Sequence, residues 1–180
     1  MLVIRPETAE DASAVRVVNE QAFARPNEAD LVDALRANAA PIISLVAEWN
    51  GRVVGHIFFS PVTVETRHGA SQSGGVSPDE AFSAMGLGPL AVLPAYQGQG
   101  IGAALVRTGL AACRDAGHDF VVVLGHRHFY PRFGFVPARS RGLYSEYDVP
   151  DEVFMVVELR DGALAGRGGL VKYRPEFSGV

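Results

Sequence analysis

A glycine-rich turn stands at residues 96–102, where the letters YQGQGIG follow a short apolar run and precede a stretch with helical spacing. The first amides of a helix lack intrahelical partners and lie at the positive end of its dipole, so they attract an anion. Glycine lets the backbone approach that anion closely and take a positive φ. The turn alone allows two interpretations: a cradle for phosphate, or a tight strand-to-helix turn that binds nothing.

Two common phosphate loops fit this turn poorly. The letters GQGIGA match G-x-G-x-x-G/A, the fingerprint of dinucleotide-binding folds. That fold places its first glycine at the strand end and an acidic residue about 20 positions later, at the end of the next strand. Here residues 94–97 separate the strand from Gly98, and the next strand ends in Gly125-His126-Arg127. A P-loop is excluded because no Gly-Lys-Ser/Thr follows.

The whole segment LAVLPAYQGQGIGAALV (90–106) resembles the acyl-CoA loop of the GNAT superfamily of N-acyltransferases, whose pattern is Gln/Arg-x-x-Gly-x-Gly/Ala. The resemblance implies that the loop amides hold the pyrophosphate of coenzyme A. The implied loop residues are Gln97, Gly98, Gln99, Gly100, Ile101, Gly102 and Ala103. The preceding strand, with Leu90, Ala91 and Val92, is implied to carry the pantetheine arm on backbone hydrogen bonds.

A second motif, FYPRFGF (129–135), places Tyr130 four residues before a Gly-Phe pair, as the superfamily does. The resemblance implies that Tyr130 donates the proton that the departing thiolate needs, since an unperturbed tyrosine pKa of about 10 lies above that of a typical thiol. The alternative is that Tyr130 only packs beside Phe129 and Phe133. Arg132 either meets the phosphates of coenzyme A or is an ordinary surface arginine.

No residue of the sequence is an obvious general base for the expected reaction. Some superfamily members carry a glutamate on the strand before the glycine loop, but FSAMGLGPLAVL (82–93) has no ionisable side chain. Candidates are Glu28, His56 and His126, acting directly or through water. Each has an alternative: a solvated helix-face glutamate, a hydrogen-bonded strand histidine and a turn residue, respectively. An amine that arrives neutral needs no base.

The remaining reactive side chains predict no metal site. Cys113 lies on the apolar side of a helical pattern, which is typical of packing. The His126-x-His128 pair, with His118 nearby in the sequence, matches no strong zinc signature and has no carboxylate or thiolate beside it. We therefore expect no metal.

Composition limits the class of protein. The formal net charge is −4 and the basic residues do not cluster, which argues against nucleic acid as the main partner. No apolar run approaches the roughly 18 residues of a membrane span, and the start of the chain does not resemble a secretory signal. A single cysteine favours a reducing compartment. We expect a cytoplasmic protein with no nucleic acid or membrane partner.

The pattern along the chain predicts one α/β (α+β) domain over residues 1–180, with a core at about 1–160 and a Gly-rich extension at 161–180. The resemblance implies a GNAT-like mixed, strongly twisted central sheet of about 6–7 strands flanked by about 4 helices. Predicted helices lie near 9–23, 28–38 and 101–115. Predicted strands lie at 3–6, 42–49, 52–65, 82–93, 120–125 and 152–159, with a short one after residue 133. The segments 66–81 and 139–150 are predicted loops.

The leading hypothesis is an N-acetyltransferase that moves an acetyl group from acetyl-CoA to a primary amine. A non-catalytic acyl-CoA sensor and a nicotinamide-dependent enzyme are the alternatives. The segments 24–30 and 139–150 are implied to face the acceptor, and they mix acidic with basic residues. That mixture leaves open a polyamine, an aminoglycoside, an amino acid and a peptide N-terminus. Strands 120–125 and 152–159 could offer a surface for a homodimer.

Overall fold

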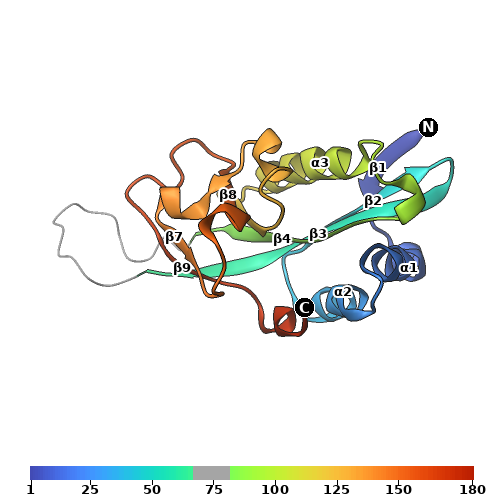
Figure 1. Cartoon of the computed structure of the whole chain (residues 1–180), viewed down its shortest axis with the longest axis horizontal. Helices are drawn as coiled ribbons and strands as arrows, with labels where there is room; N and C mark the ends of the chain where they lie inside the picture. The colour runs from blue at the N-terminus through green and yellow to red at the C-terminus, as the bar shows by residue number, and fades with distance from the viewer. Residues whose placement is uncertain (67–81) are drawn as a thin grey trace.

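The computed structural model of this chain describes residues 1–66 and 82–180 (Figure 1). The loop predicted at 66–81 therefore lies, apart from residue 66, outside the described residues. Within those ranges the three α-helices are α1 (Ala12–Phe23), α2 (Asn27–Asn38) and α3 (Ile101–Asp115). The nine strands are β1 (Leu2–Pro6), β2 (Ile43–Trp49), β3 (Arg52–Glu65), β4 (Ala84–Val92), β5 (Phe120–Leu124), β6 (Val136–Pro137), β7 (Leu143–Ser145), β8 (Phe154–Glu158) and β9 (Gly169–Lys172).

The strands form one mixed, mostly antiparallel sheet. Its order is β1-β2-β3-β4-β5-β8-β6, and β9 pairs with both β3 and β7. Only the β4–β5 and β7–β9 pairs are parallel. The α+β class is confirmed, but the sheet has more strands and the described ranges have one α-helix fewer than predicted. The extra strands β7 and β9 have three and four residues, too few for an alternating pattern to stand out in the sequence.

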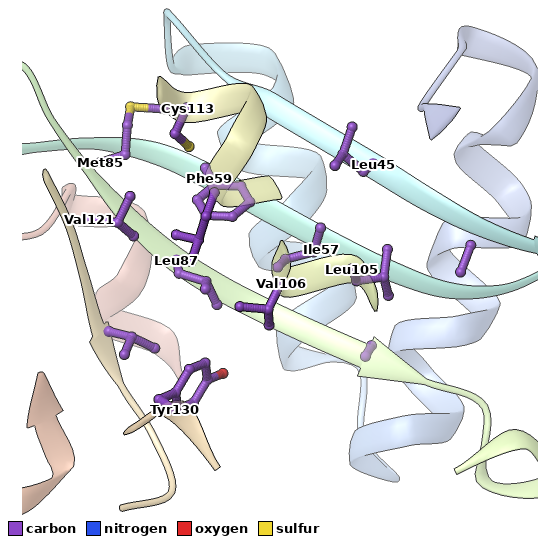
Figure 2. Packing of buried hydrophobic residues seen from close by; sticks show 14 of the residues in the cluster. Leu45, Ile57, Phe59, Met85, Leu87, Leu105, Val106, Cys113, Val121 and Tyr130 are labelled. Atoms are coloured by element: carbon purple, nitrogen blue, oxygen red, sulfur yellow. The ribbon is translucent and has the colours of Figure 1, made fainter. Parts of the chain in front are cut away.

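Helices cover both faces of the sheet. Helix α3 lies on one face, and α1 with α2 lies on the other (Figure 1). Under α3 the apolar side chains of Phe59, Leu105 and Val106 form the largest core cluster (Figure 2). Cys113 is fully buried in this cluster, where burial raises the pKa of its thiol to about 12. The expected packing role of Cys113 is confirmed.

The sheet opens between β4 and β5, and this opening positions the site. The two strands pair only from Ala84 with Phe120 to Leu87 with Val123. Strand β4 continues to Val92 and remains paired with β3 on its other edge. One edge of the second half of β4 therefore has no ladder partner among the described residues, and its backbone groups are free to meet a bound molecule.

The Gly-rich segment at 161–180 joins the same folded unit. Strand β9 pairs antiparallel with the end of β3, and the last turn, Pro175–Gly179, packs on α2. There the Asn27 amide nitrogen donates to the Gly179 carbonyl oxygen at 3.0 Å. Strands β5 and β8, expected to offer a dimer surface, each have a neighbouring strand on both sides. The β6 pairing covers only Val156 and Met155 of β8, and the homodimer stays a prediction.

Candidate active site

The glycine turn forms an open cradle at the start of α3. Gly98 and Gly100 take φ values of +77° and +84°, which L side chains rarely adopt, and Gly100 is the residue that caps α3. A Cβ atom built on either glycine would meet nothing within 4 Å. The Gln97 side-chain nitrogen donates to the Val92 carbonyl oxygen at 2.9 Å and ties the turn to the end of β4. The helix amides thus face unfilled space.

A cavity of about 300 Å³, here called the glycine-turn cavity, lies over this cradle. Eight of the predicted cofactor residues line it: Val92, Gln97, Gly98, Gly100, Ile101, Gly102, Ala103 and Arg132. Leu90, Ala91 and Gln99 are not among its lining residues. Two aromatic residues that the motif did not indicate, Tyr96 and Phe129, complete the wall.

The charge of the glycine-turn cavity suits an anion. Its floor is the positive end of α3, with three amides that have no intrahelical acceptor. The Arg132 guanidinium stacks over the Phe129 ring, 5.0 Å from its centroid, at the rim of the cavity. None of the described residues that line this cavity carries a carboxylate. The arrangement can therefore bind phosphate groups.

Tyr130 begins the neighbouring turn, Tyr130–Phe133, which follows β5. The side chain is buried, with Phe129 and Phe135 packed edge-on at ring-centroid distances of 5.0 and 5.5 Å. Figure 2 shows it at the border of the core cluster. Burial raises the pKa of Tyr130 to about 12, so its hydroxyl stays protonated at physiological pH. Tyr130 itself is not among the residues that line the glycine-turn cavity, but the preceding residue, Phe129, is.

Gly125 makes room for the Tyr130 ring, a relation that the sequence patterns did not indicate. A Cβ atom at Gly125 would lie 2.3 Å from the ring carbon Cε2 of Tyr130. Such a contact is impossible without a shift, so any side chain at residue 125 would displace the ring. Gly125 is therefore a positioning residue for Tyr130.

A second cavity, of about 460 Å³, opens on the other side of the β4–β5 gap and is here called the Tyr173 cavity. Its polar side chains are Tyr147, Tyr173, Arg25 and Glu28. The rest of its wall is apolar: Leu31, Leu87, Pro89, Leu124, Val149, Phe177 and Val180. The predicted acceptor segments 24–30 and 139–150 both contribute to it, as does the C-terminal segment, which the sequence left unassigned.

Glu28 lies in the wall of the Tyr173 cavity and is 5% exposed, so it is not a solvated helix-face glutamate. The Arg25 Nε atom donates to both of its carboxylate oxygens, at 3.1 and 3.0 Å, and Arg25 Nη2 makes a further contact with Oε1. The carboxylate thus belongs to a charge pair. This pairing suits an anchor better than a free base.

The two candidate histidines lie elsewhere. His56 is fully buried on β3, where Asn19 Nδ2 lies 3.1 Å from its Nδ1 and Ser44 Oγ lies 2.9 Å from its Nε2. Burial lowers the pKa of His56, which is the hydrogen-bonded strand histidine of the alternative interpretation. His126 is exposed, lines neither cavity and contributes its backbone carbonyl oxygen to the turn before Tyr130.

Across residues 1–66 and 82–180 no group of three or more His, Cys, Asp or Glu side chains could hold a metal ion. In the same ranges no helix is long and apolar enough to cross a membrane.

Comparisons with known proteins identify the family. The model of the acetyltransferase (GNAT) family matches residues 12–135. The uncharacterised N-acetyltransferase YhbS of Escherichia coli is 34% identical over 98% of this chain and 99% of its own length. YjhQ of the same organism, also an uncharacterised N-acetyltransferase, is 41% identical over 79% of this chain and 74% of its own.

Two solved structures are similar in fold as well as in sequence. The crystal structure of YhbS in complex with CoA has a TM-score of 0.85 and covers 98% of this chain and 91% of its own. A GNAT acetyltransferase from Brucella melitensis in complex with acetyl-CoA is 36% identical, has a TM-score of 0.75 and covers 99% of both chains. The glycine turn, the opening beside β4 and these relatives agree: this chain belongs to the GNAT family of acyl-CoA-dependent acetyltransferases.

Proposed function

We propose that the chain transfers an acetyl group from acetyl-CoA to a primary amine, with the coenzyme phosphates on the glycine turn and the pantetheine arm along the unpaired half of β4. The observation that carries this proposal is the glycine-turn cavity, in which eight motif residues meet around a helix N-terminus. The crystal structures of YhbS with CoA and of the Brucella melitensis relative with acetyl-CoA support it. The cradle fits the group, since Gly98 and Gly100 leave open space where side chains would stand.

In this proposal the phosphates and the pantetheine arm of the coenzyme contact different residues of the site. The amides of residues 98–103 and the Arg132 guanidinium hold the phosphates. Leu90, Ala91 and Val92 offer backbone groups to the arm, because their strand edge has no partner beyond Leu87. Acetyl-CoA supplies the thioester whose carbonyl carbon the amine attacks; the new C–N bond forms and the C–S bond breaks.

Tyr130 is proposed as the general acid. Its hydroxyl donates a proton, or a strong hydrogen bond, to the sulfur as the thiolate departs, and it recovers a proton from the attacking nitrogen or from solvent. A pKa of about 12 exceeds that of a free thiol, but the same buried surroundings also raise the basicity of a thiolate. The proton affinities of the Tyr130 phenolate and the departing thiolate are thereby brought closer together.

No dedicated base is assigned. Glu28 is paired with Arg25, His56 is sealed in the core, and His126 lies outside both cavities. We propose that the amine binds in its neutral form or loses its proton to water. We further propose a cytoplasmic enzyme, on the ground of its single buried cysteine.

The test is Tyr130→Phe, with Tyr144→Phe, an exposed tyrosine on β7, as its matched control. We expect the Tyr130 variant to bind acetyl-CoA as the wild type does and to lose about 10²-fold or more in kcat, since general acid catalysis contributes about 10²–10⁴. Unchanged turnover would remove Tyr130 from the chemistry. Binding of acetyl-CoA without turnover on any amine, in the wild type, would favour the alternative of a non-catalytic sensor.

A further inference from the structure

The side chains that line the Tyr173 cavity are nearly neutral in total charge, and this limits the chemical class of the acceptor amine. Among the described lining residues only Glu28 carries a side-chain carboxylate, and its charge is matched by Arg25. The other acidic residues of the predicted acceptor segments, Asp30, Glu146 and Asp148, do not line this cavity. Asp30 pairs with Arg16 on the outside of the helices, and Glu146 accepts from the Tyr173 backbone nitrogen at 2.8 Å without lining the cavity.

A polycation would be poorly held in such a cavity. Each additional ammonium group of a polyamine or an aminoglycoside needs a carboxylate partner when it leaves water, because an unpaired charge is costly to bury. The described wall offers no second side-chain carboxylate. Apolar surface is abundant in the same wall, chiefly from Leu31, Leu124, Val149 and Phe177. The cavity therefore complements a hydrocarbon or aryl group.

The cavity also lies where an acetyl group would arrive. Leu87 and Pro89 line the Tyr173 cavity, and Val92 lines the glycine-turn cavity. These residues belong to one extended strand, in which five steps span about 16 Å. A coenzyme arm that starts at the glycine turn and runs along β4 would thus end beside the Tyr173 cavity.

The C-terminal segment closes this cavity on one side. The Tyr173 and Phe177 rings pack at a tilt with their centroids 5.2 Å apart, and the Tyr147 ring lies 5.9 Å from that of Tyr173. With Val180, these rings bound a space of about 460 Å³, within the range of small-molecule sites. An aromatic wall of this kind determines which acceptors fit, through its contact with the part of the molecule that carries the amine.

We infer that the acceptor is a small primary monoamine on a compact apolar body, aryl-alkyl or branched alkyl, which occupies the Tyr173 cavity. This inference rests on the proposed function. It selects against three of the classes that the sequence left open, namely polyamines, aminoglycosides and free amino acids. The carboxylate of an amino acid would compete with Glu28 for Arg25 or lie unpaired against the apolar wall. A peptide N-terminus would require the cavity to admit a longer chain.

The test is thiol release from acetyl-CoA with five probes: phenethylamine, isoamylamine, spermidine, kanamycin and leucine, with a leucine-initiated tripeptide as a sixth. We expect kcat/KM for the two apolar monoamines to exceed that for every other probe by at least tenfold. An equal or higher value for spermidine, kanamycin, leucine or the tripeptide would overturn the inference. So would the absence of turnover with both monoamines on an enzyme that binds acetyl-CoA. Failure to bind acetyl-CoA would instead overturn the proposed function.

Two variants test whether the acceptor binds in the Tyr173 cavity. Phe177→Ala removes part of the apolar wall and should raise KM for phenethylamine about tenfold or more without changing acetyl-CoA affinity. Val149→Asp adds a carboxylate and should shift the kcat/KM ratio at least tenfold toward spermidine. Val17→Ala, on the exposed side of α1, is the control. Unchanged ratios and KM values in folded Val149→Asp and Phe177→Ala would overturn the assignment of the cavity.

Discussion

Replacing Gly125 by alanine should disable the active site through one misplaced ring. The new Cβ would stand 2.3 Å from Cε2 and 2.9 Å from Cδ2 of Tyr130, whereas ordinary contact begins near 3.4 Å. The backbone at residue 125 does not have a positive φ, so alanine itself is tolerated there. The Tyr130 ring must therefore retreat by about 1 Å, the difference between contact and overlap.

A displacement of this size has two measurable costs. A catalytic group misplaced by about 1 Å loses about 10²-fold in rate, so kcat should fall by that factor. Overpacking of the ring should lower the free energy of unfolding by about 1–3 kcal/mol. The glycine-turn cavity lacks residue 125 in its wall, so the affinity for acetyl-CoA should stay within about twofold of the wild type.

A double-mutant cycle decides whether the loss acts through the hydroxyl. Steady-state kinetics of Gly125→Ala, Tyr130→Phe and the double variant are compared, with Gly179→Ala as a control because its Cβ meets open space. If Gly125 acts only by placing the Tyr130 hydroxyl, the double variant is no slower than Tyr130→Phe alone. A double variant whose loss is the product of the two single losses would refute this reasoning.

Three further outcomes follow from buried polar groups. Because burial raises the pKa of Tyr130 to about 12, kcat should show no alkaline decline due to this residue below about pH 11; a decline at lower pH that disappears in Tyr130→Phe would contradict it. The pKa of His56 lies below its unfolded value of about 6.5, so stability is complete above that pH and falls as the folded pKa is approached. His118 acts in the same direction. Urea unfolding of His56→Gln between pH 7 and 5 should therefore have a shallower pH slope than the wild type, and an equal slope would exclude the effect. The Tyr173 hydroxyl is buried and has no hydrogen-bond partner among the described residues, so Tyr173→Phe should raise the unfolding free energy by about 1 kcal/mol; a loss of that size would reveal a missed partner.

The parts of the site that could be predicted are those that a short contiguous segment encodes. The turn around Gly98 and Gly100 carries its own signal, because positive φ, helix start and exposed amides are local properties. The placement of Tyr130 after β5 was likewise visible in one seven-residue motif. Gly98 and Gly100 line the glycine-turn cavity, and Tyr130 begins the turn next to it.

Long-range contacts hid the rest. The clearance that Gly125 gives Tyr130 depends on how two turns meet, and no pattern in the sequence reports it. The burial of Glu28 depends on the C-terminal segment with Phe177, which is 149 positions away and has no periodic signal. The same holds for β7 and β9, whose pairing with each other and with β3 creates strands from segments that read as loops.

The measurement that tests the account most directly is calorimetric titration of the protein with acetyl-CoA and coenzyme A, with NADH as a control. The wild type should bind both acetyl-CoA and coenzyme A, and it should not bind NADH. Gly100→Val should abolish that binding while the protein stays folded, because a β-branched residue cannot take the φ of +84° that keeps the cradle open. Absence of coenzyme A binding in the wild type, or undiminished binding in Gly100→Val, would contradict the assignment of the glycine turn as the phosphate site.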